Sequence, residues 1–175
     1  NVNGKTQEQP FKIVQSPVSE GSESDINKQF DFIKSVNDKV SEAHQAITDI
    51  RSMKAQVKSY SDKIADKEIK DYAAKMDSIA SDVEKNLYQT KNKSGQDPLN
   101  FPIKLTNKLA HLNSLMGMGV NDFPPTVSMY EVRDELISMI DKELRKWYDV
   151  KGAMLVELNR MIKSKALDVI ILKKE

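Results

Sequence analysis

Residues 22–94 contain neither glycine nor proline, so all twelve glycines and prolines of the chain lie outside this stretch of 73 residues. The stretch is rich in Ala, Lys, Asp, Ser and Ile. A β-protein needs turn-forming residues at short intervals, whereas a long helix excludes them. The stretch therefore predicts an all-α fold.

Apolar residues recur at spacings of three and four, as on one face of a helix. The first set spans 26–64 and predicts a helix of about 40 residues, roughly 60 Å long, with Ser24 as its N-cap. The pattern then slips, and Asp66 is expected to cap a second helix over 69–87.

Two segments rich in the helix-breaking residues glycine and proline divide the rest of the chain. Residues 91–102 are the strongest predicted loop, because they hold one glycine and two prolines that forbid a continuing helix. Pro102 is expected in the first turn of a third helix, and Gly117 and Gly119 are expected to end it.

A fourth helix is predicted after Pro124 and Pro125, with Thr126 or Ser128 as its cap, and it should run for about 35–40 residues. Gly152 inside it marks a local kink or a close helix contact. Residues 167–172 are β-branched enough to leave the helix or to form a terminal strand.

The expected helix lengths are about 40, 22, 16 and 38 residues between caps. If the helices run alternately up and down, the lengths in the two directions nearly cancel. We therefore predict an elongated antiparallel four-helix bundle with two long and two short helices. Four helices would lie side by side at one end of this bundle, and two at the other. The bundle domain would comprise 24–175. Residues 1–23 would hold a short β-strand near 9–14 and a linker.

Composition excludes several classes of function. Basic residues number 27 and acidic residues 26, a balance that argues against a nucleic-acid binder. No apolar run approaches the roughly 18 residues of a membrane span. The absence of cysteine excludes disulfides, thiolate metal sites and a cysteine nucleophile.

Catalytic motifs are not recognisable either. The two histidines, His44 and His111, lack the Glu-x-x-His spacing of a di-iron bundle. No serine-nucleophile motif, phosphate loop or dinucleotide fingerprint is present, so we expect no enzyme, no metal and no cofactor. Trp147, beside Arg145 and Tyr148, fits a partner-binding cluster or the bundle core, and its place in the apolar pattern favours the core.

The loop carries a resemblance to a known family. Residues 87–110 include Ser94-Gly95-Gln96-Asp97-Pro98-Leu99-Asn100-Phe101-Pro102. This segment resembles the C-terminal helical region of large secreted bacterial proteins with sortilin-type or BNR (Asp-box) β-propeller repeats, often labelled glycosyl hydrolases. Residues 29–32, 38–44 and 47–51 resemble the first helix of that region, and 124–136 resemble the entry to its last.

The resemblance implies that an immunoglobulin-like β-domain precedes the helices, with residues 4–14 as its last strand. It departs where the family continues with Asp-Pro-Arg and this chain has Gln15-Ser16-Pro17, and again over 167–175. Any catalytic carboxylates would belong to the propeller, so none is carried over. A secreted or periplasmic location follows from the resemblance.

These observations favour a non-catalytic accessory domain, a stalk or docking module whose partner is the rest of a propeller-containing polypeptide. The alternative is a glycan- or protein-binding module that uses the loop, with Asn92, Gln96, Asp97, Asn100 and Phe101 as the interaction residues. The loop itself is better interpreted as a structural connector, in which Asp97, Asn92 and Asn100 would satisfy backbone donors and Phe101 would close the bundle end.

An exposed apolar patch would favour docking, a concave polar pocket at the loop would favour ligand binding, and a buried carboxylate pair would favour a hydrolase. Self-association is expected to cover the two-helix end.

Overall fold

The computed structural model describes residues 3–4, 6–118 and 122–165. It is all-helical in these residues, with α1 (Glu23–Ser61), α2 (Lys67–Leu87), α3 (Leu105–Met118) and a long last helix. The last helix consists of α4 (Val127–Asp149), a π-helical turn (Val150–Met154) and α5 (Leu155–Ser164). The only other helical element in the described chain is a 3-10 turn at Asp97–Leu99. The predictions of an all-α class and a helical bundle are confirmed.

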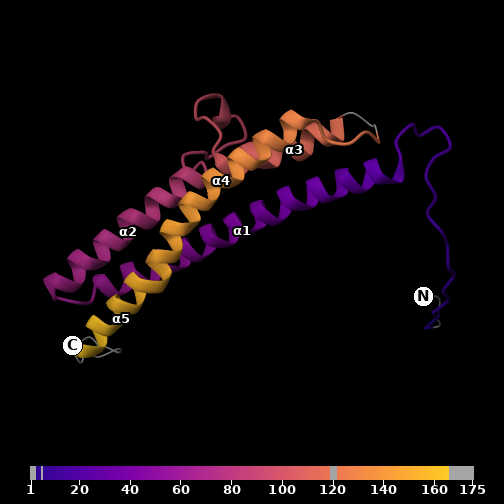
Figure 1. The fold of residues 1–175 in the computed structure, drawn as a ribbon. Coiled ribbons are helices and arrows are strands. Elements are labelled where there is room, and N and C mark those ends of the chain that lie inside the picture. Colours follow the sequence, from indigo (N-terminus) through magenta and orange to yellow (C-terminus); the bar gives the residue numbers. More distant parts are fainter. Residues whose placement is uncertain (1–2, 5, 119–121, 166–175) are drawn as a thin grey trace.

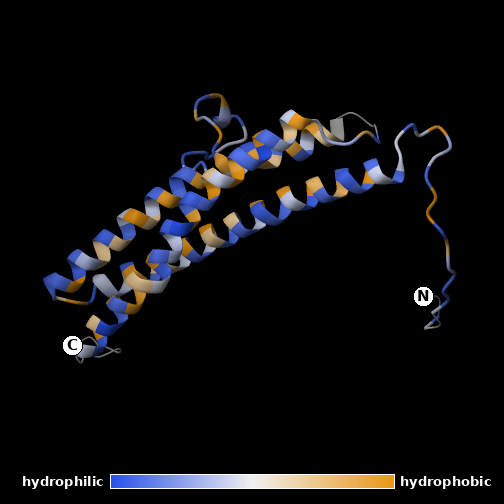
Figure 2. Cartoon of the chain, in the orientation of Figure 1, coloured by the Kyte–Doolittle hydropathy of each residue, from blue (hydrophilic) through white to orange (hydrophobic). Residues whose placement is uncertain are grey.

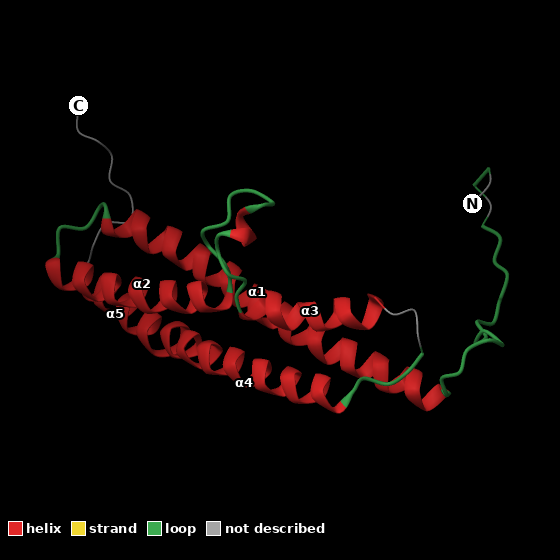
Figure 3. Cartoon of the chain, turned by 90° about the horizontal axis from the view of Figure 1, so that it is seen from above, coloured by secondary structure: helices red, strands yellow, loops and turns green. Residues whose placement is uncertain are grey.

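The helices form three rods (Figures 1 and 3). The first rod is α1. The second is α2 followed by α3, and both run antiparallel to α1. Residues late in α1 meet α2 where Lys54 Nζ lies 2.6 Å from Ser81 Oγ. Residues early in α1 meet α3 where Asn113 Nδ2 donates to Asn37 Oδ1 over 2.7 Å.

The third rod, α4 and α5, runs parallel to α1. Residue numbers rise together along the two helices in three pairs, which are Arg133 with Ser35 at 3.3 Å, Lys39 with Asp141 at 2.8 Å and Lys151 with Asp49 at 2.9 Å. The two long helices therefore pair along much of their length, as expected, but in the parallel sense.

The predicted arrangement of four helices at one end and two at the other is wrong. The loop after α2 carries the chain forward, and Thr106 Oγ1 donates to the Leu87 carbonyl over 2.9 Å, so α3 begins where α2 ends. Because α3 continues away from α2, it packs on the first half of α1. In this half Phe32 and Val36 are both 0% exposed, and burial of such apolar side chains favours the arrangement.

Helix caps agree with the sequence at two of three starts. The Asp66 side chain accepts from Ile69 N at 3.1 Å, and the Thr126 side chain accepts from Met129 N at 3.3 Å. The first helix starts earlier than predicted, because Ser22 and Asp25 form a reciprocal capping box that displaces Ser24 from the cap.

The third helix also differs at its ends. It begins at Leu105, because Pro102 belongs to the loop, where its carbonyl accepts from Gln89 Nε2 over 2.7 Å. It continues through Gly117 to Met118, so Gly117 does not end it, and Gly119 lies outside the described residues, as do 167–172.

The strand predicted near 9–14 is not formed. Residues 6–16 leave the bundle without strand pairing (Figure 1), and Phe11, Ile13 and Val14 are 71–86% exposed. A strand needs a neighbour to accept its backbone hydrogen bonds, and the described residues offer no second strand. The linker that follows is tied to the bundle where Ser19 Oγ donates to Asp122.

Apolar residues recur along the helices of all three rods (Figure 2), and the buried ones from the three rods form one hydrophobic core. The largest fully buried ones include Phe32 in the first half of the bundle and Trp147 in the second, at 0% and 2% exposure. The core interpretation of Trp147 is thereby confirmed. Its neighbour Tyr148 faces solvent and donates to Glu42 Oε1 over 2.7 Å.

Gly152 lies in the exposed π-helical turn, where a Cβ would meet no atom within 4 Å outside its own helix backbone and chain neighbours. The predicted irregularity is therefore a π turn, and the alternative of a close helix contact is wrong. Glycine costs a helix interior about 0.5–1 kcal/mol relative to alanine. We expect Gly152→Ala to raise the free energy of unfolding in urea by about that amount. A loss of stability would show that the π turn itself requires glycine.

Candidate functional site: a groove between α1 and α5

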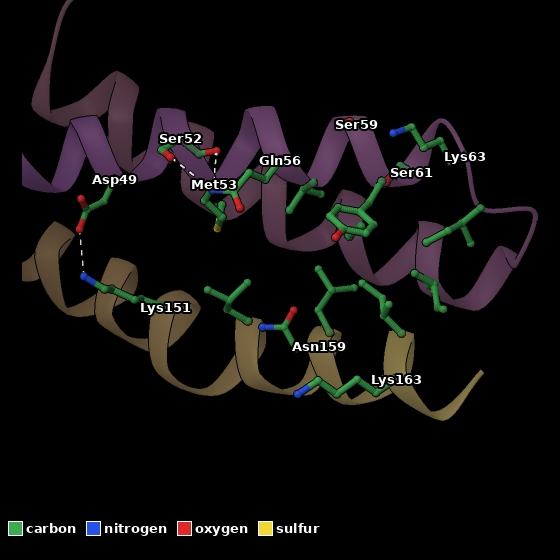
Figure 4. Close-up of a pocket in the computed structure, with 18 of the residues that line it drawn as sticks. Asp49, Ser52, Met53, Gln56, Ser59, Ser61, Lys63, Lys151, Asn159 and Lys163 are labelled. Atoms are coloured by element: carbon green, nitrogen blue, oxygen red, sulfur yellow. Dashed lines mark hydrogen bonds and ion pairs between the residues drawn. The ribbon is translucent and has the colours of Figure 1, made fainter. Parts of the chain in front are cut away.

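The last helix moves away from α1 beyond the π-helical turn. Up to this turn α4 packs against α1, whereas α5 packs on α2 and makes no close backbone approach to α1. The separation leaves a groove of about 1130 Å³ (Figure 4). We name it the α1–α5 groove. It follows α1 from Asp49 to Ser61, about 18 Å at 1.5 Å per residue, and continues along the turn after α1 to Ile64.

The middle of the groove is apolar. Trp147 and Ile69 are buried beneath it, Val57 and Tyr60 of α1 line one wall, and Leu155 and Ile162 of α5 line the other. Tyr60 is 42% exposed, unusually high for a large apolar side chain in this half of α1. Contact of such an apolar surface with water is unfavourable, so covering it with another apolar group would lower the free energy.

The two ends of the groove differ in charge. At one end Lys151 Nζ donates to Asp49 Oδ2 over 2.9 Å, and this bond, followed by one from Gln45, lowers the pKa of Asp49. At the other end the exposed Lys63 and Lys163 stand on either side (Figure 4). The groove therefore has a neutralised end and a basic end.

An ion pair fixes α5 at the basic end. Lys165 Nζ lies 3.0 Å from Asp66 Oδ2, at the start of α2. The bond from Lys165 and then the backbone N–H of Ile69 lower the pKa of Asp66. Because Asp66 also caps α2, one side chain holds both the turn after α1 and the end of α5.

Polar side chains within the groove suit a peptide backbone. Ser52, Gln56 and Asn159 are exposed and line it, and they offer hydroxyl and amide groups that both donate and accept. Asp49 is the one carboxylate in the lining, so the groove lacks the facing pair that a glycosidase requires. Within the described residues no group of three or more histidine or acidic side chains gathers to hold a metal ion. None of the described helices is long and apolar enough to cross a membrane.

The loop residues predicted as an interaction site do not converge. The loop projects from the side of the bundle at the α2–α3 junction (Figures 1 and 3), with Asn92, Gln96 and Asn100 exposed. Phe101 is half-buried, and its ring lies 5.6 Å from Lys91 Nζ, so it does not close the bundle end. A hollow of about 420 Å³ between the end of the loop and α4 is lined by none of the five predicted residues.

Asp97 has a structural role in this loop. Its carboxylate accepts from Lys93 N, and from Ser94 N and Ser94 Oγ, both at 2.8 Å. These bonds, first the backbone one from Lys93, lower the pKa of Asp97 from its ordinary 3.8. The carboxylate that the sequence offered as an interaction group is thus occupied by its own loop.

Acid should loosen the loop before it unfolds the bundle. A carboxyl whose pKa is lowered by folding contributes stability above its unfolded pKa and loses it as the pH falls through the folded one. We therefore expect amide exchange of Lys93 and Ser94 to accelerate as the pH falls below about 3.8, measured by NMR. Asp97→Ala should show the fast exchange already at neutral pH, with helix content unchanged. Slow exchange in this variant would contradict the assigned role.

The sequence pattern did not reveal the α1–α5 groove. Its lining residues follow the same spacing as buried core residues, and only the divergence of α5 distinguishes them. No protein-family model, curated protein or solved structure matches this chain. The site therefore rests on its own geometry.

Proposed function

We propose that this chain is a non-catalytic helical accessory domain of a larger exported protein, and that its α1–α5 groove docks an apolar segment of that protein. The observation that supports this proposal is the groove itself, which has a volume of about 1130 Å³ and apolar walls that do not pack against each other. Helical grooves of this kind bind segments through apolar anchors, with a polar rim that fixes their orientation.

The exposed N-terminal segment supports the accessory role. Phe11, Ile13, Val14 and Val18 are 71–87% exposed, a concentration of apolar surface that a neighbouring domain would cover. The apolar cluster Phe11-Lys12-Ile13-Val14 suits the last strand of a preceding β-domain, in keeping with the resemblance to propeller-containing proteins. An exported location, secreted or periplasmic, follows from the same resemblance.

The loop-binding alternative has weaker support. Neither the α1–α5 groove nor the hollow of about 420 Å³ at the start of α3 is lined by its exposed residues, and Asp97 is engaged within the loop. A hydrolase of its own has no support from the groove lining, which holds a single carboxylate paired with Lys151.

Site-specific photo-crosslinking in the larger polypeptide tests the docking role. A benzoylphenylalanine replaces Gln56, which lines the groove, or Ser78, which is exposed on α2 outside it. We expect position 56 to crosslink a segment outside residues 1–175 in at least about tenfold excess over position 78, because only the groove position is covered by the docked segment. Equal yields at the two positions would overturn the proposal.

A further inference from the structure

We infer that the partner segment docked in the α1–α5 groove is an amphipathic helix of about three turns, which runs antiparallel to α1 and carries acidic side chains in its first turn. The inference, which rests on the proposed docking role, specifies the conformation, direction and charge of the docked segment. Each of these properties is set by the way in which α1, α2 and α5 surround the groove.

The helices at this end of the molecule occupy three corners of a four-helix bundle. Helix α2 packs against both α1 and α5, whereas α1 and α5 make no close approach to each other. Helices α1 and α5 therefore lie at opposite corners, with α2 at a corner between them. Ile69 and Ala73 of α2, both buried, belong to the groove lining, so the groove opens across from α2. Among the described helices none fills this fourth corner.

A helix fits the fourth corner in length and width. The groove follows α1 for about 18 Å, which corresponds to about twelve helical residues. A helix of that length and about 10 Å across occupies roughly 1400 Å³, so the groove of about 1130 Å³ would enclose most of it. Its outer face would remain in solvent, and the occupant is therefore amphipathic.

Backbone hydrogen bonding favours a helix over an extended segment. An extended backbone needs partners for its N–H and C=O groups, and a groove between helices has no free strand edge to supply them. A helix bonds its own backbone except at its two ends. The exposed polar residues of the lining, such as Ser52, Gln56 and Asn159, can then bond polar side chains on the flanks of the docked helix or its terminal backbone groups.

The neighbouring helices set the direction of the docked one. Helices α1 and α5 end at Ser61 and Ser164, and α2 begins at Lys67, so α2 runs antiparallel to both. A helix in the fourth corner would contact the same two neighbours. The antiparallel direction completes an up-and-down bundle and opposes its dipole to those of α1 and α5, which is favourable. Its N-terminus then lies at the basic end of the groove.

The basic end sets the charge of the docked helix. Acidic side chains stabilise the first turn of a helix, and there they would lie opposite Lys63 and Lys163 (Figure 4). Neither lysine forms an ion pair with another described residue. Helix α2 shows the same arrangement at this end, because its Asp66 and Glu68 carboxylates lie 3.0 and 4.0 Å from Lys165 Nζ. An acidic first turn would complete it on the opposite corner.

Photo-crosslink mapping tests the conformation and the direction together. In the proposed larger polypeptide, benzoylphenylalanine replaces Ser52 or Ser59, two exposed groove residues that lie about 10 Å apart along α1. We expect their crosslinks to fall about seven partner residues apart, because a docked helix rises as α1 does, and those from Ser59 to come first in the partner sequence. A separation of about three residues would indicate an extended segment, and the reverse order a parallel helix. Either result would overturn the inference.

Charge reversal tests the acidic first turn. We expect Lys63→Glu with Lys163→Glu to weaken binding of the preceding part of the proposed larger polypeptide, produced as a separate protein, at least about threefold in isothermal titration. Lys58→Glu with Lys70→Glu is the matched control, because both lysines are exposed near this end but lie outside the groove lining. Equal affinities for the two double variants would contradict an acidic first turn at the basic end.

The crosslinks also separate this inference from the proposed function. Ser78, exposed on α2 outside the groove, is the reference position. If positions 52 and 59 crosslink no segment outside residues 1–175 above this reference, docking itself is contradicted. Crosslinks that reach only residues 1–175 of a second copy would overturn docking and the inference together. Strong crosslinks outside residues 1–175 with the wrong spacing or order contradict the antiparallel helix alone and leave docking intact.

Discussion

Trp147→Ala should lower the free energy of unfolding by about 3–5 kcal/mol, the usual loss for a buried aromatic cut back to alanine. Trp147 is 2% exposed and packs where the last helix meets α1 and α2, directly beneath the α1–α5 groove. Urea denaturation followed by circular dichroism measures the effect.

Tyr148→Ala is the matched control. Tyr148 is 48% exposed, and its one polar contact is with the partly exposed Glu42, so its loss should cost less than about 1 kcal/mol. Equal losses for the two variants would contradict the assignment of Trp147 to the core.

Phe32→Ala should destabilise the other half of the bundle by a similar amount, about 3–5 kcal/mol. Phe32 is 0% exposed, and the Tyr130 ring meets it edge-on at a centroid distance of 5.3 Å. The Arg133 guanidinium lies 5.3 Å from the Phe32 centroid and 4.9 Å from that of Tyr130. The substitution therefore removes an aromatic pair and a cation–π contact as well as buried area.

The single tryptophan makes this substitution a test of cooperativity. Because α1 and the last helix run through both halves, we expect the fluorescence transition of Trp147 to shift together with the loss of helix signal. Phe30→Ala, on the same helix but 63% exposed, should change stability by about 0.5 kcal/mol or less. An unmoved fluorescence transition in Phe32→Ala would mean that the two halves unfold independently.

Local features of this fold were predictable from the sequence because they depend on neighbouring residues. Asp66 and Thr126 were identified as caps since short polar side chains bond backbone groups three residues on. The breaker-free stretch and the two proline-rich segments located the helices and loops. The cap at Ser22 was missed by two residues, because Ser22 and Ser24 are chemically equivalent and only the reciprocal bond with Asp25 distinguishes them.

Topology was less predictable because it depends on contacts distant in sequence. Helix lengths of 39, 21 and 14 residues allow α3 either to return along α2 or to continue beyond it. The choice rests on the Thr106 bond to Leu87 and on covering Phe32 and Val36. The predicted strand failed for the same reason, since a strand is completed by a partner and the described residues supply none.

The candidate site was the feature least predictable from the sequence. Asp97 was predicted either to bind a partner or to satisfy backbone donors of its own loop, and its bonds to Lys93 N and Ser94 N confirm the second role. The residues that form the groove, such as Tyr60 and Ile162, look like ordinary core positions in the sequence. The apolar stripe on α1 extends past the level of the π-helical turn, beyond which the last helix no longer packs on α1.

The docking proposal is tested most directly by binding of the part that would precede this chain in the proposed larger polypeptide, produced as a separate protein. Isothermal titration would compare Tyr60→Ala, in the groove, with Phe30→Ala, an exposed aromatic on the same helix outside it. Central aromatic anchors contribute at least about 1.4 kcal/mol to such interfaces, a factor of ten in affinity. We therefore expect Tyr60→Ala to weaken binding tenfold or more and Phe30→Ala to leave it unchanged. Equal affinities for the two variants would contradict docking in the α1–α5 groove.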